Sequence, residues 1–315
     1  MLILRFAVTG RFLGSGLVLA LSLPAALAVA PAQDGAPSFV GSAAELVVLP
    51  VTVTDRRGGF VEDMPRERFK VFDNGRPQDL VLFSSEDTPV SVGLVIDDSG
   101  SMRPKLPDVV TAALSFARLS NPQDELFAIA FNDTVLGLND GRATLVSDVR
   151  SLELALRSLR PEGRTALYDA MMVGLERVER SSTARKALLV MSDGGDNASR
   201  ATLDEVLTRA RHSNVTIFTI GLFKDDDLDQ NPGVLKSLAQ STGGERFLPQ
   251  SPELITAACE RIARELRTGY TLGYVPPDAD GAYHRVRVEV DQPKGARLAV
   301  RTRPGYFAAR VAARP

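Results

Sequence analysis

The positions of apolar residues divide most of the chain into three parts with different periodicity. Residues 45–88 hold short runs that alternate apolar and polar positions, with a strong turn signal at 73–75 (Asp-Asn-Gly). Residues 89–267 alternate apolar runs of strand length with segments that have helical periodicity. From 268 to 308 the period of two returns, most clearly at 283–290. The pattern predicts an α/β segment between two β segments.

The central segment predicts a doubly wound, Rossmann-like α/β fold. Strands are expected at 91–97, 125–131, 134–138, 187–192, 214–221 and 245–248, and helices at 106–119, 147–159, 166–181, 202–212, 232–241 and 252–267. Asn132-Asp133 lies between two strand runs and indicates a hairpin, so we expect one antiparallel strand. The other connections imply right-handed crossovers and a mainly parallel sheet with helices on both faces.

Neither flanking β segment holds enough strands for a core of its own. We therefore expect 45–88 and 268–308 to form one small β-sandwich, with the α/β segment inserted between its two halves. Two separate small sheets packed on the α/β segment are the alternative. Residues 309–315 are expected to be a short tail.

The first 44 residues have a different composition. Arg5 and Arg11 precede or flank an apolar run over 12–30, and small residues follow at 30–32 (Ala-Pro-Ala). This pattern predicts a signal peptide over 1–32, followed by a linker over 33–44. A retained membrane anchor is the alternative, because the run is nearly long enough to span a bilayer. We therefore expect an exported protein, periplasmic, on the cell surface or secreted, which contacts a membrane only if 12–30 stays uncleaved.

Composition excludes some classes of function. The formal net charge is −2, tryptophan is absent and aromatic residues make up 6% of the 315 residues, so nothing favours nucleic-acid binding. Cys259 is the only cysteine, which excludes an intrachain disulfide. Its place in a helical pattern predicts a small buried side chain.

Oxygen-bearing side chains follow the apolar run at 92–96. Asp97, Ser99 and Ser101 stand at alternate positions, and on a tight loop they can direct three oxygens at one point. Hard oxygen ligands suit a hard cation such as magnesium. Thr165 stands where a loop enters a predicted helix, and Asp193 ends another apolar strand. Since parallel sheets bind ligands at the carboxyl ends of their strands, the sequence predicts a cation site there.

Three features follow one another on these elements: Asp-x-Ser-x-Ser, a helix that follows a threonine, and Ser-Asp-Gly. In this order they closely resemble the von Willebrand factor type A domain. The resemblance covers 89–267, and the chain is also similar to exported bacterial proteins that carry such a domain between β segments. It implies a metal-ion-dependent adhesion site (MIDAS) that binds Mg²⁺, with Ca²⁺ or Mn²⁺ as alternatives, and accepts an Asp or Glu carboxylate from a partner protein. The implied metal-binding residues are Asp97, Ser99, Ser101, Thr165 and Asp193.

Within this set the resemblance assigns direct hydroxyl ligands to Ser99 and Ser101, and a direct or water-mediated ligand to Thr165. Asp97 and Asp193 would bind directly or through waters. Asp98 stands at a position that the motif leaves free, and we expect it to face solvent.

We expect a binding protein rather than an enzyme. A serine nucleophile needs a base, and neither His212 nor His284 has a sequence reason to reach Ser99. Two alternatives to an adhesion-type module remain: a structural or assembly component of an envelope complex that docks without metal, and an accessory subunit of a metal-dependent enzyme.

Overall fold

A computed structural model describes residues 46–138, 144–145, 149–223, 230–292 and 297–310. The expected signal peptide and linker lie outside these residues. Among the described residues no helix is both long and apolar enough to span a membrane.

A seven-stranded sheet forms the centre of the α/β part. Its strand order is β11-β10-β9-β5-β6-β7, and β8 also pairs with β6. The strands are β5 (Val90–Asp97), β6 (Glu125–Phe131), β7 (Val135–Leu138), β8 (Thr144–Leu145), β9 (Arg185–Ser192), β10 (Val215–Gly221) and β11 (Arg246–Phe247). The predicted hairpin is confirmed, because β7 runs antiparallel to β6. β8, which the pattern did not predict, also pairs antiparallel with β6, and the other pairs are parallel.

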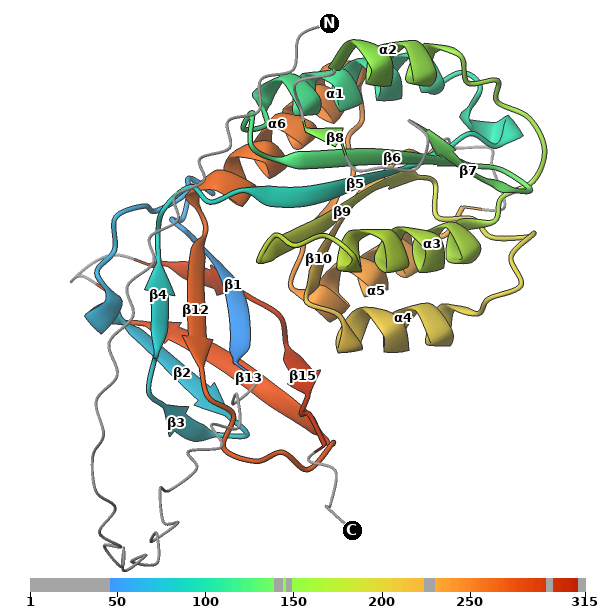
Figure 1. The fold of residues 1–315 in the computed structure, drawn as a ribbon. Helices are drawn as coiled ribbons and strands as arrows, with labels where there is room; N and C mark the ends of the chain where they lie inside the picture. Colours follow the sequence, from blue (N-terminus) through green and yellow to red (C-terminus); the bar gives the residue numbers. More distant parts are fainter. Residues whose placement is uncertain (1–45, 139–143, 146–148, 224–229, 293–296, 311–315) are drawn as a thin grey trace, which may run out of the picture. The chain divides into compact units, whose positions relative to one another are not determined.

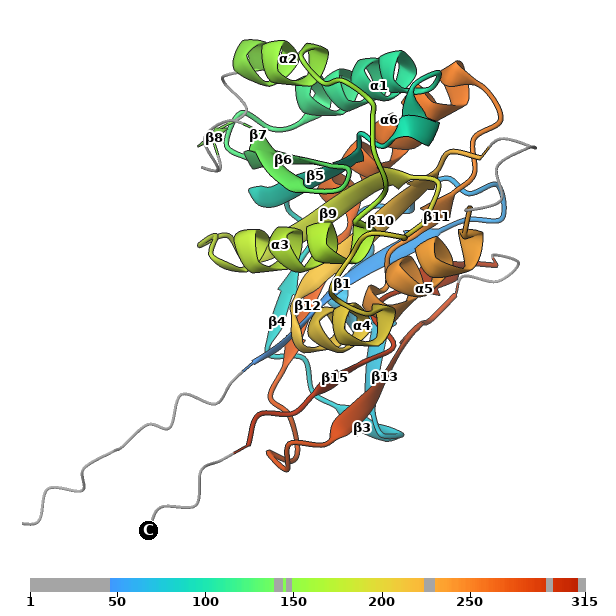
Figure 2. The ribbon, with the colours of Figure 1, turned by 90° about the vertical axis from the view of Figure 1, so that its right-hand side faces the viewer.

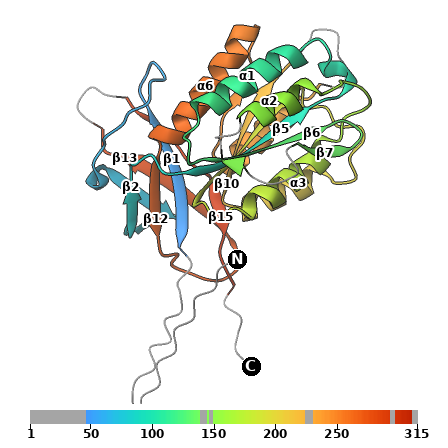
Figure 3. The same ribbon diagram turned by 45° about the horizontal axis from the view of Figure 1, so that its top comes forward.

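Helices cover both faces of this sheet, as Figures 1 and 3 show. They are α1 (Leu106–Leu119), α2 (Val149–Arg157), α3 (Leu167–Glu179), α4 (Leu203–His212), α5 (Pro232–Thr242) and α6 (Pro252–Thr268). Helices α1, α2 and α6 share one apolar core with the sheet, and α3, α4 and α5 share the other. All eight residues of β5 are buried, because this central strand contacts both cores. Cys259 is buried in the first core, as expected.

The strands at the two ends of the chain form two four-stranded antiparallel sheets. The N-terminal segment supplies β1 (Val47–Thr54), β2 (Phe69–Asp73), β3 (Arg76–Gln78) and β4 (Leu82–Ser84), and the C-terminal segment supplies β12 (Tyr270–Tyr274), β13 (Tyr283–Val290), β14 (Ala299–Arg301) and β15 (Gly305–Phe307). The sheet orders are β14-β1-β12-β4 and β15-β13-β2-β3, so each sheet combines strands from both segments (Figure 1). The expected β-sandwich is therefore present.

The sandwich core lies between these two sheets. Strands β1 and β13 alternate buried and more exposed residues, because one face of each packs inward. Their buried valines share one apolar cluster with Tyr270 and Leu272. The hydroxyl of Tyr270 accepts a hydrogen bond from Met64 N–H (3.0 Å) and donates to Val61 O (2.8 Å). These bonds fix the loop before β2 against the core.

Partly buried polar contacts join the sandwich to the α/β part. Glu265, on α6, is 4% exposed and accepts hydrogen bonds from Thr52 Oγ1 of β1 (2.9 Å) and Arg301 Nη2 of β14 (2.5 Å). Arg303 donates to Asn214 Oδ1 (3.0 Å) and to Arg211 O (2.8 Å) at the end of α4. The last helix and α4 are thus both attached to the sandwich.

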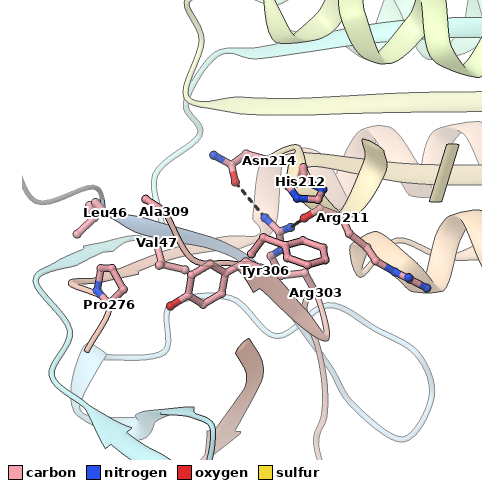
Figure 4. Close-up of a pocket in the computed structure, with 10 residues that line it drawn as sticks. Leu46, Val47, Arg211, His212, Asn214, Pro276, Arg303, Tyr306 and Ala309 are labelled. Atoms are coloured by element: carbon pink, nitrogen blue, oxygen red, sulfur yellow. Dashed lines mark hydrogen bonds between the residues drawn. The ribbon is translucent and has the colours of Figure 1, made fainter. Parts of the chain in front are cut away.

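A small cavity of about 80 Å³ lies beside the Arg303 contacts (Figure 4). His212 stacks on Phe307 there, with ring centroids 3.9 Å apart. The guanidinium of Arg303 also donates to Gly305 O (2.8 Å), so all three of its nitrogens are hydrogen-bonded to protein acceptors. This cation therefore acts as a structural link between α4 and β15.

Candidate metal centre

The first loop of the candidate site follows β5. Asp97, the last residue of β5, is fully buried, and its two carboxylate oxygens accept hydrogen bonds from Ser99 N–H (3.0 Å) and Ser192 Oγ (2.6 Å). A short 3₁₀ turn, Gly100–Met102, comes next, and Met102 is buried in the core. The Asp97–Ser99 bond and the Met102 anchor together hold the loop tightly against the sheet.

The second part of the site follows β9, which pairs directly with β5. Asp193 Oδ1 accepts Gly195 N–H at 3.1 Å, and Asp193 Oδ2 accepts Ser101 Oγ at 2.8 Å. Ser101 Oγ also lies 3.2 Å from Ser99 Oγ. Gly194 has a φ of +80°, and a Cβ there would lie 2.4 Å from Asn231 O, so the turn after Asp193 requires glycine.

The third part is the loop that enters α3. Gly163 O accepts Gly100 N–H (3.2 Å), which joins this loop to the first one. Thr165 O accepts the N–H groups of Asn197 and Ala198, both at 3.0 Å, and Thr165 N–H donates to Asn197 Oδ1 at 2.9 Å. These bonds join it to the segment after Asp193.

Two carboxylates, one from each of the joined segments, reinforce that junction. Asp196 Oδ2 accepts Tyr168 N–H (2.9 Å), and Asp169 accepts the N–H groups of Arg200 and Ala201. A carboxylate at a helix N-terminus satisfies an N–H group that has no partner within the helix.

The structure thus brings the sequence-predicted residues to one edge of the sheet. Asp97, Ser99, Ser101 and Asp193 are linked by direct hydrogen bonds. Thr165 stands on the adjoining loop and is linked through backbone bonds.

The donor set suits a hard divalent cation. In octahedral coordination with metal–oxygen distances of about 2.0–2.1 Å, neighbouring ligand oxygens lie about 3 Å apart. The Ser99–Ser101 and Ser101–Asp193 oxygen pairs, at 3.2 and 2.8 Å, are close to that spacing. The candidate set combines three hydroxyls with two carboxylates. Within the described part of the chain, no three His, Cys, Asp or Glu side chains form a metal-binding group. The candidate set favours Mg²⁺ over softer metals.

Electrostatics also favours a cation here. Burial raises the pKa of Asp97 to about 6, hydrogen bonds from Ser192 and Ser99 partly oppose that rise, and the charge of Asp193 adds to it. Both carboxylates are at least 97% buried. A nearby cation would stabilise the charged form of a buried carboxylate such as that of Asp97.

Asp98 corrects one expectation. It is 5% exposed rather than directed at solvent, and burial raises the pKa of its carboxyl. Its Oδ2 accepts Arg160 N–H (3.3 Å) and its carbonyl accepts Glu162 N–H (3.1 Å), because the segment before Gly163 folds over it. Asp98 therefore positions that segment.

Sequence reasoning missed two residues of this site. Ser192 was assigned to a strand and to the Ser-Asp-Gly motif but not to the site, although its hydroxyl donates to Asp97 Oδ2 (2.6 Å) and accepts Gly194 N–H (2.9 Å). Asn197 showed no sign of its role beside Thr165. The available signal for Ser192 was its position directly before Asp193 in Ser-Asp-Gly.

Neither histidine of the chain forms a catalytic pair with these serines. His284 Nδ1 lies 2.8 Å from Asp73 Oδ1 within the sandwich, and His212 Nδ1 lies 2.9 Å from Thr208 O.

Comparison with known proteins identifies the α/β part. The family model of the von Willebrand factor type A domain matches residues 91–256, just over half of the chain. An uncharacterised protein of Synechocystis sp. is 30% identical over 176 residues, which are 52% of this chain and 38% of that protein. The chain therefore matches well under half of the length of that relative.

One solved structure shows the same fold, and a second is reported beside it. A von Willebrand factor type A protein from Catenulispora acidiphila superposes with a TM-score of 0.51 at 14% identity, over 85% of this chain and 75% of that one. The type A domain of the type V pili tip protein Mfa5 from Porphyromonas gingivalis gives a TM-score of 0.47 at 15% identity, over 56% and 95%.

Proposed function

Because the chain belongs to the von Willebrand factor type A domain family, we propose that it is an exported, metal-dependent protein-binding module and not an enzyme. The observation that carries the proposal is the direct contact among the oxygens of Ser99, Ser101 and Asp193 beside the buried carboxylate of Asp97.

In this proposal Ser99 and Ser101 hold Mg²⁺ through their hydroxyls, and Thr165 adds a third hydroxyl. Asp97 and Asp193 supply the negative charge, directly or through waters. Two acids balance a divalent cation without exceeding its charge. The bound ion would supply an electrophilic position for an Asp or Glu carboxylate of a partner protein, and Ca²⁺ or Mn²⁺ could take its place.

The roles of the other residues follow from their contacts. Ser192 holds the Asp97 carboxylate in place by donating to Oδ2, which leaves fewer positions for that carboxylate to adopt. Asn197 ties Thr165 to the segment after Asp193. Such bonds orient the groups that contact a metal.

Export is proposed from the N-terminal pattern. Basic residues at 5 and 11, the apolar run over 12–30 and the small residues at 30–32 are typical of a cleaved signal peptide. Mass spectrometry of the mature protein from the envelope fraction tests this: a new N-terminus near residue 33 supports cleavage, and an intact N-terminus supports an anchor.

A titration calorimetry experiment tests the metal centre. Wild-type protein freed of metal should bind Mg²⁺ or Mn²⁺ with one site per chain. Ser101→Ala and Asp193→Asn should weaken binding at least about tenfold, because each removes one ligand oxygen or one charge. Asp204→Asn, which removes an exposed carboxylate on α4, is the matched control and should bind like the wild type. Equal binding in all four proteins would refute the assignment.

A pull-down from envelope extract tests the function. A partner should be captured with Mg²⁺ and lost both with chelator and with Asp97→Ala. A partner retained in both cases would favour the alternative of metal-independent assembly and contradict the adhesion mechanism.

A further inference from the structure

A polar groove of about 520 Å³ lies between the sandwich and the α/β part, and it is lined by residues of α5, β11 and α6 on one side and of β1 and β14 on the other. Figure 2 shows α5, β11 and β1 on this side of the molecule. None of the five proposed metal-binding residues lines it.

The described lining of the groove carries an excess of positive charge. Among the described lining residues, four cations, Lys236, Arg246, Arg261 and Arg301, stand against one carboxylate, Glu245. The chain as a whole has a formal net charge of −2, so these cations are concentrated locally.

Three of these cations have no carboxylate partner among the described residues. Arg246 donates to Pro232 O (2.7 Å) and Arg261 to Gly58 O (2.8 Å), which are neutral acceptors. Lys236 is exposed on α5. In the described part of the chain none of the three forms an ion pair with a carboxylate, whereas Arg301 pairs with Glu245 (3.1 Å) and with a buried acid of α6.

A strand edge also borders the groove. β14 is the terminal strand of its sheet and pairs only with β1 among the described strands. All three residues of β14 line the groove, and Val300 also packs against the sandwich core. An unpaired strand edge offers N–H and C=O groups to an extended chain.

We propose that this groove binds an extended acidic segment of a partner protein. The segment adds to the edge of β14 through its backbone and directs its carboxylates at Lys236, Arg246 and Arg261. A peptide fits better than other anions because it alone complements both the strand edge and the cations. The site is separate from the metal centre and does not depend on it.

Fluorescence anisotropy with a labelled eight-residue peptide of alternating Glu and Thr tests the proposal, in chelator and at low salt. We expect saturable binding that weakens as salt rises. The Lys236→Glu, Arg246→Glu double variant should bind at least about tenfold more weakly, because two favourable charge contacts become repulsive. The double variant Arg118→Glu, Arg157→Glu has the same change in net charge at exposed positions on α1 and α2, and it should bind like the wild type.

Two further measurements examine the backbone contact and the independence from metal. A peptide of the same sequence with alternate backbone nitrogens methylated should bind much more weakly, and hydrogen exchange should slow at 299–301 when the unmodified peptide is bound. Asp97→Ala should bind the peptide normally, so a failed metal centre would leave this result intact. Equal loss in both double variants, or equal binding of the methylated peptide, would overturn the proposal.

Discussion

Replacing Asp73 by alanine should lower the free energy of unfolding of the sandwich by about 4 kcal/mol. Asp73 ends β2 and is fully buried. Its carboxylate accepts hydrogen bonds from Tyr274 Oη (2.8 Å) and Tyr306 Oη (2.7 Å), and lies 2.8 Å from His284 Nδ1. Tyr274 belongs to one sheet and the other three residues to the second, so this carboxylate links the two sheets.

The magnitude follows from these contacts. A hydrogen bond to a charged group stabilises a protein by about 1.5–3 kcal/mol, and Asp73 makes three such contacts. Part of that sum is offset, because the variant no longer buries a carboxylate. Breaking a buried charge network from one side costs about 3–5 kcal/mol in general, which agrees with the value expected here.

Urea unfolding followed by tyrosine fluorescence measures this effect. The chain has no tryptophan, and four of its five tyrosines lie at 270–306, so the signal reports mainly on the sandwich. Asp73→Asn keeps the shape of the side chain and should cost about half as much. Lys70→Ala removes an exposed ion pair on the same strand and should change stability by less than about 0.5 kcal/mol. A loss below about 1 kcal/mol for Asp73→Ala would refute the reasoning.

Three further predictions concern packing, pH and reactivity. Gly93→Ala should destabilise the protein by about 1–3 kcal/mol in urea unfolding followed by circular dichroism, because a Cβ there would lie 2.3 Å from Phe127 Cζ. An unchanged midpoint would show that the sheet adapts. Desolvation lowers the pKa of His284, but its hydrogen bonds to Asp73 and Asp280 outweigh that effect and raise the pKa overall. The stabilisation by His284 should therefore be complete below the unfolded pKa of about 6.5 and be lost as pH rises through the folded pKa. The urea midpoint of the sandwich should fall over that pH range. In Asp73→Asn the midpoint should fall less. Burial raises the pKa of the Cys259 thiol, so a thiol reagent should label it only in denaturant, and rapid labelling of the native protein would contradict its burial.

Much of the α/β part could be predicted because its apolar residues follow local periods. The helix at 106–119 has the predicted limits, and the helix at 252–267 extends by one residue. β8, with only two residues, is too short to produce a pattern. The three oxygen-bearing motifs could also be placed at one sheet edge, because parallel strands end at the same edge.

The sequence by itself determined the types and order of the longer elements and the insertion of the α/β segment between two β segments, and it predicted the residues of the candidate metal centre. Only the tertiary structure decided that β1 pairs with β12 and β14, that Asp98 is buried, and that Ser192 and Asn197 support the site. Local periodicity reports which face of an element is apolar, but it does not report which distant element covers that face. Thr52 and Arg301 pair across 248 intervening positions, and the charged groove exists only because that pairing brings β14 opposite α5.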